Sequence, residues 1–473
     1  MRRQCFAVVA ACLLAGCATA RSVPAAVSAP SPPPEIAVLI ERGCYRCLER
    51  ALALAIEHEA PQRAFEAATL LALRSLELGL PAAPWVAEAR AIASGDSSWT
   101  MYLEMVAAVP PDPLSGARDD VLFETQARNR QRALLPMWRE ALVAGPASDT
   151  FSRYLDLTLL CAVDSFRDRG DELAVVVERL PAVPLLEYRA GSCGSRYESR
   201  LAMVRTRDVE FMDADYALGR YALENREGQN QEEALRRLQS AAAAFPESPA
   251  IVTTIGNLYQ SWEDWRSALG AYDAAIALVP GHPDALIGRT ISLSYLDRHE
   301  EAIETATRLI TDGRWFLGQA HYWRAWNHFN LGEYPVARAD ADRTRTLMVN
   351  AAVFVLSGMI EWRLGRAANA EKEFEDAITM DAGQCDAALL LGGVRSELAK
   401  RASAIVALEQ AQRCFDLLIA VRRRAIDAVN DGPGTAETKA REIARHTRAI
   451  AEAESRRGEA EKARGTLQRL ERG

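Results

Sequence analysis

The 473-residue sequence lacks the short motifs that mark common catalytic and nucleotide-binding sites: it has no HExxH, no GxSxG, no Walker loop and no GxGxxG. No stretch alternates apolar and polar residues for long enough to predict a sheet. The formal net charge is −8 and no basic block is present, which argues against nucleic acid as the main partner. These absences favour a non-catalytic, helical chain.

Metal-ligand patterns are equally scarce. Among six histidines, only His321 and His328 lie close together, two helical turns apart on one face, and we expect them to pack rather than to bind a metal. Two pairs of aspartates stand two residues apart, so their members do not face one another on a helix. We expect these on the solvated surface: Asp213 with Asp215, and Asp340 with Asp342. We therefore predict neither a metal nor a cofactor.

The N-terminus begins with two arginines and an apolar run over residues 5–15. The run is shorter than the roughly 20 residues that span a bilayer and is typical of a signal peptide. It ends in the sequence LAGC at Leu14–Cys17, which resembles a bacterial lipobox. The resemblance implies that residues 1–16 are removed and that Cys17 is lipidated. An ordinary secretory signal is the alternative.

Residues 17–35 are rich in Pro and Ser, and the three prolines at 32–34 favour extended polyproline II. This composition predicts a tether that lifts the folded body off the lipid surface. Two or more acyl chains would hold the chain stably on a membrane. By the same family analogy, Ala18 in place of Asp favours the outer membrane, with the body in the periplasm.

Residues 36–207 show helical apolar spacing at irregular intervals, which predicts degenerate helical hairpins. Gly79 and Pro81 close the first hairpin. The expected helices are Ile36–Glu59, Gln62–Leu78, Trp85–Ala93, Ser98–Ala108, Ala117–Val143, Thr150–Phe166 and Asp171–Arg179.

A 34-residue unit at Pro249–His282 organises the rest of the chain. Small residues at its eighth and twentieth positions, Gly256 and Ala268, would let two helices approach closely. Tyr259 and Tyr272 would fill the space beside them. Units of similar spacing precede and follow it: Asp215–Ser248, Pro283–Phe316, Gly318–Ala351, Ala351–Gln384 and Cys385–Leu418.

The length and spacing of these units resemble the tetratricopeptide repeat (TPR) family. The resemblance implies an all-α fold, a right-handed α-solenoid of helix hairpins. About six repeats would occupy residues 208–418, after an irregular helical half over 36–207. The segment 419–473 would supply capping helices, because its strongly charged part at Thr435–Arg469 suits the exposed end of a stack.

Six of the nine cysteines lie outside the signal peptide and the lipidation site. An even number in an exported chain suggests disulfides. Cys385 begins its repeat and Cys414 stands at repeat position 30. The start of the first helix lies beside the end of the second in an antiparallel hairpin, so these two residues can bond. Cys161 is then paired with Cys193 by elimination.

Cys44 and Cys47 form a CxxC near the start of the first expected helix. A helix N-terminus lowers a thiol pKa, so a redox dithiol is one interpretation and a structural disulfide is the other. No βαβ pattern surrounds the motif and no second CxxC completes a zinc site, which favours the structural disulfide. Leu48, where a haem motif needs His, argues against haem attachment.

In the TPR family, the first helix of each repeat lines a concave surface. Carried over to this register, the lining positions are aromatic and apolar with a polar end, which suits an extended or helical peptide. The alternative is that the N-terminal half covers this groove. The expected groove residues are Asn257, Ile291, Tyr295, Tyr322, Trp326, Phe329, Asn330, Met359, Trp362 and Arg363.

These patterns predict a lipid-anchored scaffold that mediates protein–protein interactions in the bacterial cell envelope, without catalysis of its own. One alternative is a periplasmic solute- or glycan-binding lipoprotein that uses the same aromatic groove. Another is a thiol–disulfide protein that uses Cys44 and Cys47.

Overall fold

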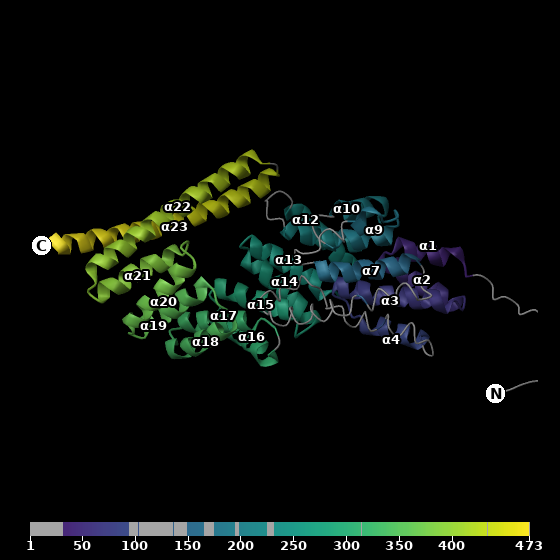
Figure 1. Ribbon diagram of the computed structural model, residues 1–473, viewed down its shortest axis with the longest axis horizontal. Coiled ribbons are helices and arrows are strands. Elements are labelled where there is room, and N and C mark those ends of the chain that lie inside the picture. Colours follow the sequence, from purple (N-terminus) through teal and green to yellow (C-terminus); the bar gives the residue numbers. More distant parts are fainter. Residues whose placement is uncertain are drawn as a thin grey trace, which may run out of the picture.

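The computed structural model describes residues 32–93, 103, 136, 149–164, 175–193, 198–224, 231–313, 315–432 and 434–472. All regular structure over these residues is helical, which confirms the predicted all-α fold. Helices adjacent in sequence pack on one another, so the chain forms an elongated array of stacked hairpins (Figure 1). Cys17, the helix expected at 117–143 except residue 136, and most of the one at 98–108 lie outside the described residues.

The N-terminal helices pack at the first end of the array (Figure 1). They are α1 (Pro34–Arg42), α2 (Tyr45–Glu57), α3 (Pro61–Leu78), α4 (Ala83–Ile92), α7 (Asp149–Asp164), α9 (Pro184–Gly191) and α10 (Glu198–Arg207).

The prediction of one helix over Ile36–Glu59 is wrong, because the chain turns at Gly43. This glycine has a φ of 68° and ends α1 in the left-handed conformation. The Sγ atom of Cys44 then accepts the backbone N–H of Cys47 and caps α2. The CxxC therefore begins the second helix.

The regular part of the array follows the predicted repeats, with one helix pair in each. Its helices are α11 (Asp213–Glu224), α12 (Gln231–Ala244), α13 (Pro249–Ser261), α14 (Trp265–Leu278), α15 (Pro283–Tyr295), α16 (His299–Asp312), α17 (Leu317–Asn330), α18 (Tyr334–Leu347), α19 (Ala351–Arg363), α20 (Ala367–Met380), α21 (Cys385–Glu397) and α22 (Arg401–Asp431).

Glycines beside large side chains set the spacing of these helices. The fully buried ring of Tyr272 lies against both Gly256 and Gly288, and a Cβ on Gly256 would stand 2.6 Å from it. Any larger residue at either glycine would push two helices apart. The same pairing recurs along the array: Gly219 with Leu238, Gly358 with Phe374, and Gly392 with Leu408.

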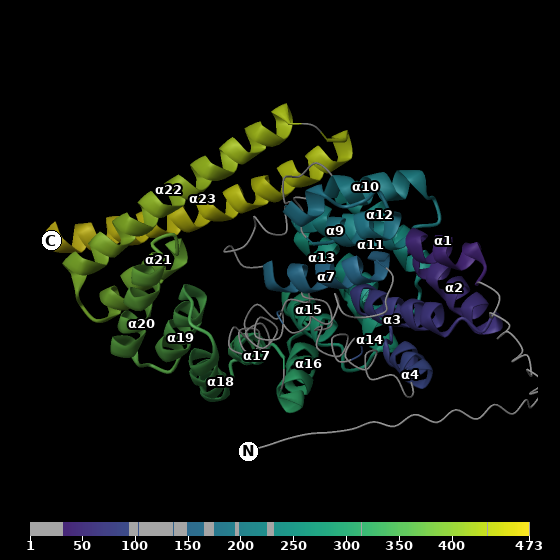
Figure 2. The same ribbon diagram turned by 45° about the vertical axis from the view of Figure 1, so that its right-hand side comes forward.

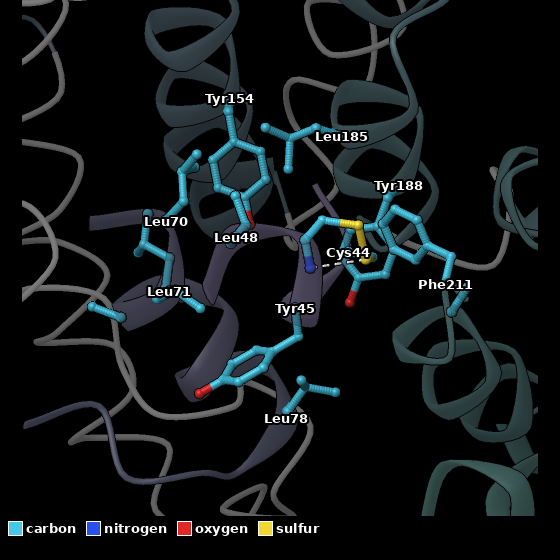
Figure 3. Packing of buried hydrophobic residues seen from close by; sticks show 14 of the residues in the cluster. Cys44, Tyr45, Leu48, Leu70, Leu71, Leu78, Tyr154, Leu185, Tyr188 and Phe211 are labelled. Atoms are coloured by element: carbon cyan, nitrogen blue, oxygen red, sulfur yellow. Dashed lines mark hydrogen bonds between the residues drawn. A yellow bond between two sulfur atoms is a disulfide. The ribbon is translucent and has the colours of Figure 1, made fainter. Parts of the chain in front are cut away.

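One continuous apolar core joins the N-terminal helices to the first repeats. Figure 3 shows part of it, with Tyr154 and Tyr188 packed near the start of α2. The end of α3 docks on the start of α13, because Ser248 donates its hydroxyl hydrogen to the carbonyl of Leu78. The described helices of the N-terminal half thus extend the array at its first end.

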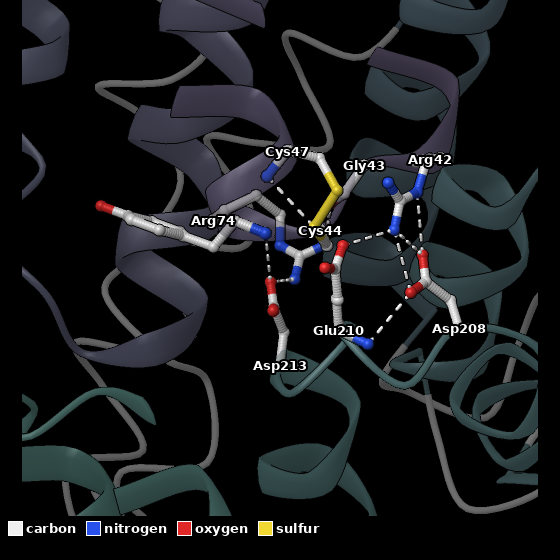
Figure 4. Close-up of a disulfide and its surroundings, with 9 residues drawn as sticks. Arg42, Gly43, Cys44, Cys47, Arg74, Asp208, Glu210 and Asp213 are labelled. Carbon is white, nitrogen blue, oxygen red and sulfur yellow. Dashed lines mark hydrogen bonds and ion pairs between the residues drawn. A yellow bond between two sulfur atoms is a disulfide. The ribbon is translucent and has the colours of Figure 1, made fainter. Parts of the chain in front are cut away.

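A buried ion pair lies inside this core. The Arg74 side chain is fully buried, pairs with Asp213 and Glu77, and places its guanidinium 3.5 Å from the ring centroid of Tyr188. Asp213 also accepts the backbone N–H of Tyr45 at 3.0 Å. Figure 4 shows Arg74 and Asp213 beside the start of α2. One carboxylate therefore connects α2, α3 and α11.

The prediction that Asp213, Asp215, Asp340 and Asp342 lie on the solvated surface is wrong for the first three. Asp213 and Asp215 are buried because arginines from other segments reach them: Arg74 pairs with the first, Arg205 and Arg237 with the second. Asp340 is also buried, beside His321 and Arg324. Asp342 is exposed as expected.

The last two helices form a long antiparallel hairpin that returns along the array (Figures 1 and 2). The second of them is α23 (Ala436–Arg472). Its C-terminal half covers the end of the stack, since Ala453, Ala460 and Leu467 pack at seven-residue spacing into a cluster with α21 and α22. Thr435, directly before this helix, bonds to Glu232 of α12, and the first half of the helix reaches the corner between α13 and α14.

We expect Asp213→Ala to lower the free energy of unfolding by about 3–5 kcal/mol, because it leaves the Arg74 guanidinium buried without this carboxylate. Asp342→Ala is the matched control. Its carboxylate is exposed, so its effect should stay within about 0.5 kcal/mol. Denaturant unfolding followed by circular dichroism measures both, and equal effects would contradict this role for the ion pair.

Candidate functional site

The corner between α13 and α14 carries the sequence WEDW at Trp262–Trp265. Trp262 caps α13, and Glu263 turns the chain with a φ of 60°. The Asp264 carboxylate accepts the backbone N–H of Ser267 at 3.1 Å and caps α14. This tight turn holds two indole rings and two carboxylates together at one end of the repeat.

An aromatic row extends from this corner across the next two repeats. The rings of Trp265 and Tyr295 stack at 4.1 Å, with 6° between their planes. Tyr295 also contacts Trp323, at 5.8 Å between ring centroids. Tyr295 is 55% exposed, whereas Trp265 and Trp323 are partly buried, so the row meets solvent mainly at Tyr295.

The first half of α23 lies opposite this corner, and an open pocket of about 630 Å³ lies between them. On the array side, Tyr259, Trp262 and Trp265 line the pocket, and Arg441 and Arg448 line it on α23. The Arg441 guanidinium lies 4.1 Å from the ring centroid of Trp262. Arg448 pairs with Glu263 at 2.8 Å. The pocket therefore combines aromatic faces with charges of both signs.

Tyr295 also lies near charged residues of the corner and of α23. Partial burial raises the pKa of the Tyr295 hydroxyl, and the nearby carboxylates of Glu263 and Glu452 raise this pKa further. Because Glu452 belongs to α23, the last helix faces the aromatic row as well as the pocket.

The ten predicted groove residues differ in exposure. Asn257, Tyr295, Asn330 and Arg363 are exposed. The other six are partly buried in clusters between repeats: Ile291, Tyr322, Trp326, Phe329, Met359 and Trp362.

Trp362 illustrates why these residues are buried. Its ring lies against Gly393, where a Cβ would stand 2.8 Å away, and its Nε1 donates to Glu397 at 2.6 Å. Two of the exposed residues are also held in place, since Asn257 accepts a hydrogen bond from the Tyr272 hydroxyl and Asn330 donates one to the carbonyl of Trp326. Much of the predicted groove thus builds the contacts between successive repeats.

Sequence reasoning missed the side chains that surround the pocket. Trp262 and Trp265 are absent from the predicted groove because the family positions fall on the first helix of each repeat. The paired tryptophans around two acidic residues at a repeat turn are a local signal that could have drawn attention to them. Arg441 and Arg448 carry no such signal, because their partners belong to a distant repeat.

The structure places the three expected cysteine pairs at disulfide distance. The Cα–Cα separations are 4.9 Å for Cys44–Cys47, 5.2 Å for Cys161–Cys193 and 5.3 Å for Cys385–Cys414.

The CxxC disulfide is buried rather than poised for exchange. Cys44 is 1% and Cys47 4% exposed. Figure 4 shows the bond between the Arg74–Asp213 pair and a second ion pair, in which Arg42 contacts Asp208 at 2.8 Å. Thiol–disulfide exchange requires a thiolate to reach one of the sulfurs, so this environment favours a structural role.

The histidines singled out in the sequence pair with carboxylates. His321 lies 2.8 Å from Asp340, and His328 lies 2.5 Å from Glu333. Over the described part of the chain, no cluster of three His, Cys, Asp or Glu side chains is arranged to hold a metal. No helix in the same residues has the length and hydropathy to cross a membrane.

We expect the Cys44–Cys47 bond to resist reduction in the folded protein, because both sulfurs are buried. In millimolar reductant followed by alkylation and peptide mapping, the other two pairs should be labelled first, since Cys161, Cys193 and Cys414 are partly exposed. Cys44 and Cys47 should be labelled only when denaturant is added. Labelling of Cys44 and Cys47 ahead of the other two pairs would instead favour an exchange-active dithiol.

No protein-family model matches the chain, and no curated protein matches it. Solved structures are similar in part. A tetratricopeptide repeat protein from Parabacteroides merdae is 16% identical with a TM-score of 0.39, over 55% of this chain and 93% of that one. PilW, a widely conserved type IV pilus biogenesis factor, is 16% identical with a TM-score of 0.39, over 43% and 92%. The APC/C hetero-tetramer Cut9–Hcn1 is 14% identical with a TM-score of 0.39, over 89% and 87%.

Proposed function

We propose that this chain is a non-catalytic scaffold that binds a protein partner at the corner formed by Trp262, Trp265 and Tyr295. The observation that carries the proposal is the aromatic row, exposed at Tyr295, beside a pocket of about 630 Å³. Trp, Tyr and Arg contribute most of the binding energy in protein interfaces when they lie at the centre of the contact. This corner gathers all three residue types.

The packing of the predicted groove residues supports the choice of this corner. Most of the predicted groove aromatics are engaged between repeats, so a partner finds less free aromatic surface there. At the corner, Glu263 and Asp264 are exposed and give the aromatic centre a polar rim, an arrangement typical of specific interfaces.

The proposal includes a location in the bacterial cell envelope. The lipobox-like sequence before Cys17 and the Pro- and Ser-rich tether support attachment by lipid to the outer membrane, with the helical body in the periplasm. An anchored scaffold of this kind would hold its partner near the membrane without moving into the bilayer.

A photoreactive amino acid at position 295 should crosslink to a discrete protein partner in intact cells, because this side chain projects from the aromatic row. The same residue at position 307, on the exposed face of α16, is the control and should give no such product. Mass spectrometry of the purified products identifies the partner. Protein crosslinks that are equal at both positions would contradict the site, and loss of a bound glycan on Tyr295→Ala would favour the glycan-binding alternative.

Cys17→Ser should release the protein from the membrane, because serine offers no thiol for the lipid. We expect the wild type in the membrane fraction with incorporated fatty acid and the variant in the soluble fraction without it. Cys17 and the six disulfide cysteines are distinct, so the variant should fold normally. Unchanged incorporation of fatty acid in the variant would refute lipid attachment at Cys17.

A further inference from the structure

The two halves of α23 are held by different kinds of contact. The C-terminal half buries Ala453, Ala460 and Leu467 in an apolar cluster. The first half instead turns polar residues inward: Thr438, Glu442 and His446 are each less than 10% exposed. A helix segment whose inner face is polar gains little from hydrophobic burial, so the first half is the less firmly held part.

The first half touches the corner through two arginines seven residues apart. Arg441 and Arg448 lie on one face of the helix, because seven residues complete nearly two turns. Arg441 stacks over Trp262 and Arg448 pairs with Glu263. The Arg448 and Glu263 side chains are 61% and 42% exposed, and exposed ion pairs contribute little to stability.

The fit of Arg441 to the corner is incomplete. Its Nη1 is buried without a hydrogen-bond partner among the described atoms, and its Nη2 reaches only Glu437 at 3.4 Å. A guanidinium has five donors, so this cation leaves hydrogen-bonding capacity unused. The corner therefore has room for an arginine side chain but does not use all of its hydrogen-bond donors.

The chemistry of the corner matches arginine in particular. Two indole rings, those of Trp262 and Trp265, line the pocket together with the carboxylates of Glu263 and Asp264. A planar guanidinium stacks on an aromatic face and also pairs with a carboxylate, which a lysine ammonium does less well.

We propose that the corner recognises a partner helix carrying arginines seven residues apart, and that the first half of α23 is its built-in occupant, which the partner displaces. This inference rests on the proposed function and names the class of partner. Because α23 is part of the same chain, its effective concentration at the corner is of millimolar order. A partner must therefore fit the corner better than α23 does.

The probe for this inference is a fluorescent peptide of residues 436–452, which contains both arginines. Its binding to the full mature chain is measured by anisotropy in low salt. In the opened variant Arg441→Ala/Arg448→Glu, the introduced glutamate faces Glu263 and repels it. We expect this variant to bind the peptide at least tenfold more tightly than the wild type does.

Two controls isolate the arginine contacts. A peptide with Arg441→Ala and Arg448→Ala should lose at least tenfold in affinity, whereas a peptide with Lys439→Ala and Arg445→Ala, which loses the same charge, should bind nearly normally. Adding Glu263→Gln to the opened variant should weaken binding of the peptide several-fold, because the corner then lacks the carboxylate that pairs with the second arginine. Circular dichroism and disulfide mapping verify that each variant is folded.

Equal binding of both altered peptides, or no binding to the folded opened variant, would overturn the inference. If crosslinking at position 295 still captures a protein in that case, the proposed function stands with a different partner class. If the opened variant binds the arginine peptide but position 295 captures no protein in cells, the corner is specific for arginine helices and the proposed function fails.

Discussion

The spacing of the helices in the array depends on glycines, which have no side chain where a large ring packs against them. Tyr272 can occupy the space between two repeats only because Gly256 and Gly288 present no Cβ to its ring. The close approach fixes the position of α15 relative to α13 and α14, and with it the place where the ring of Tyr295 meets that of Trp265 at 4.1 Å. A methyl group at either glycine would move helices in a densely packed interior, so the candidate site inherits its geometry from positions that never touch a partner.

Repetition explains which parts of the structure could be predicted from the sequence. In the array, each helix pair carries the same small and large positions, so Gly256, Ala268 and Tyr272 predict a packing that recurs. In the N-terminal half no such register exists. The break at Gly43 depends on one glycine with a positive φ and a cap from Cys44, and helical spacing alone runs through it. The short helices α9 and α10 escaped prediction for the same reason.

The candidate site could be predicted only in part, because exposure depends on partners from other segments. Family register places Tyr295 and Trp362 on equivalent helices, yet the first is exposed and the second lies against Gly393. From the sequence Asp213 is predicted to lie on the surface, but in the structure it is buried beside Arg74 of α3, which is 139 residues away in the chain. Arg441 over Trp262 is a contact of the same kind, since a residue of the last helix meets an early repeat. Pairings of this kind leave no periodic trace in the sequence.

The two halves of α23 differ in how strongly they are held against the array. Burial of a side chain such as Leu467 contributes about 1.5–3 kcal/mol, whereas an exposed ion pair such as Arg448–Glu263 contributes about 0–1 kcal/mol. Had apolar residues continued to the position of His446, the helix would close the corner permanently. Buried polar groups such as Glu442 and His446 instead keep this half in register at low net stability. The hairpin is thus anchored at the end of the array and weakest where it crosses the aromatic corner.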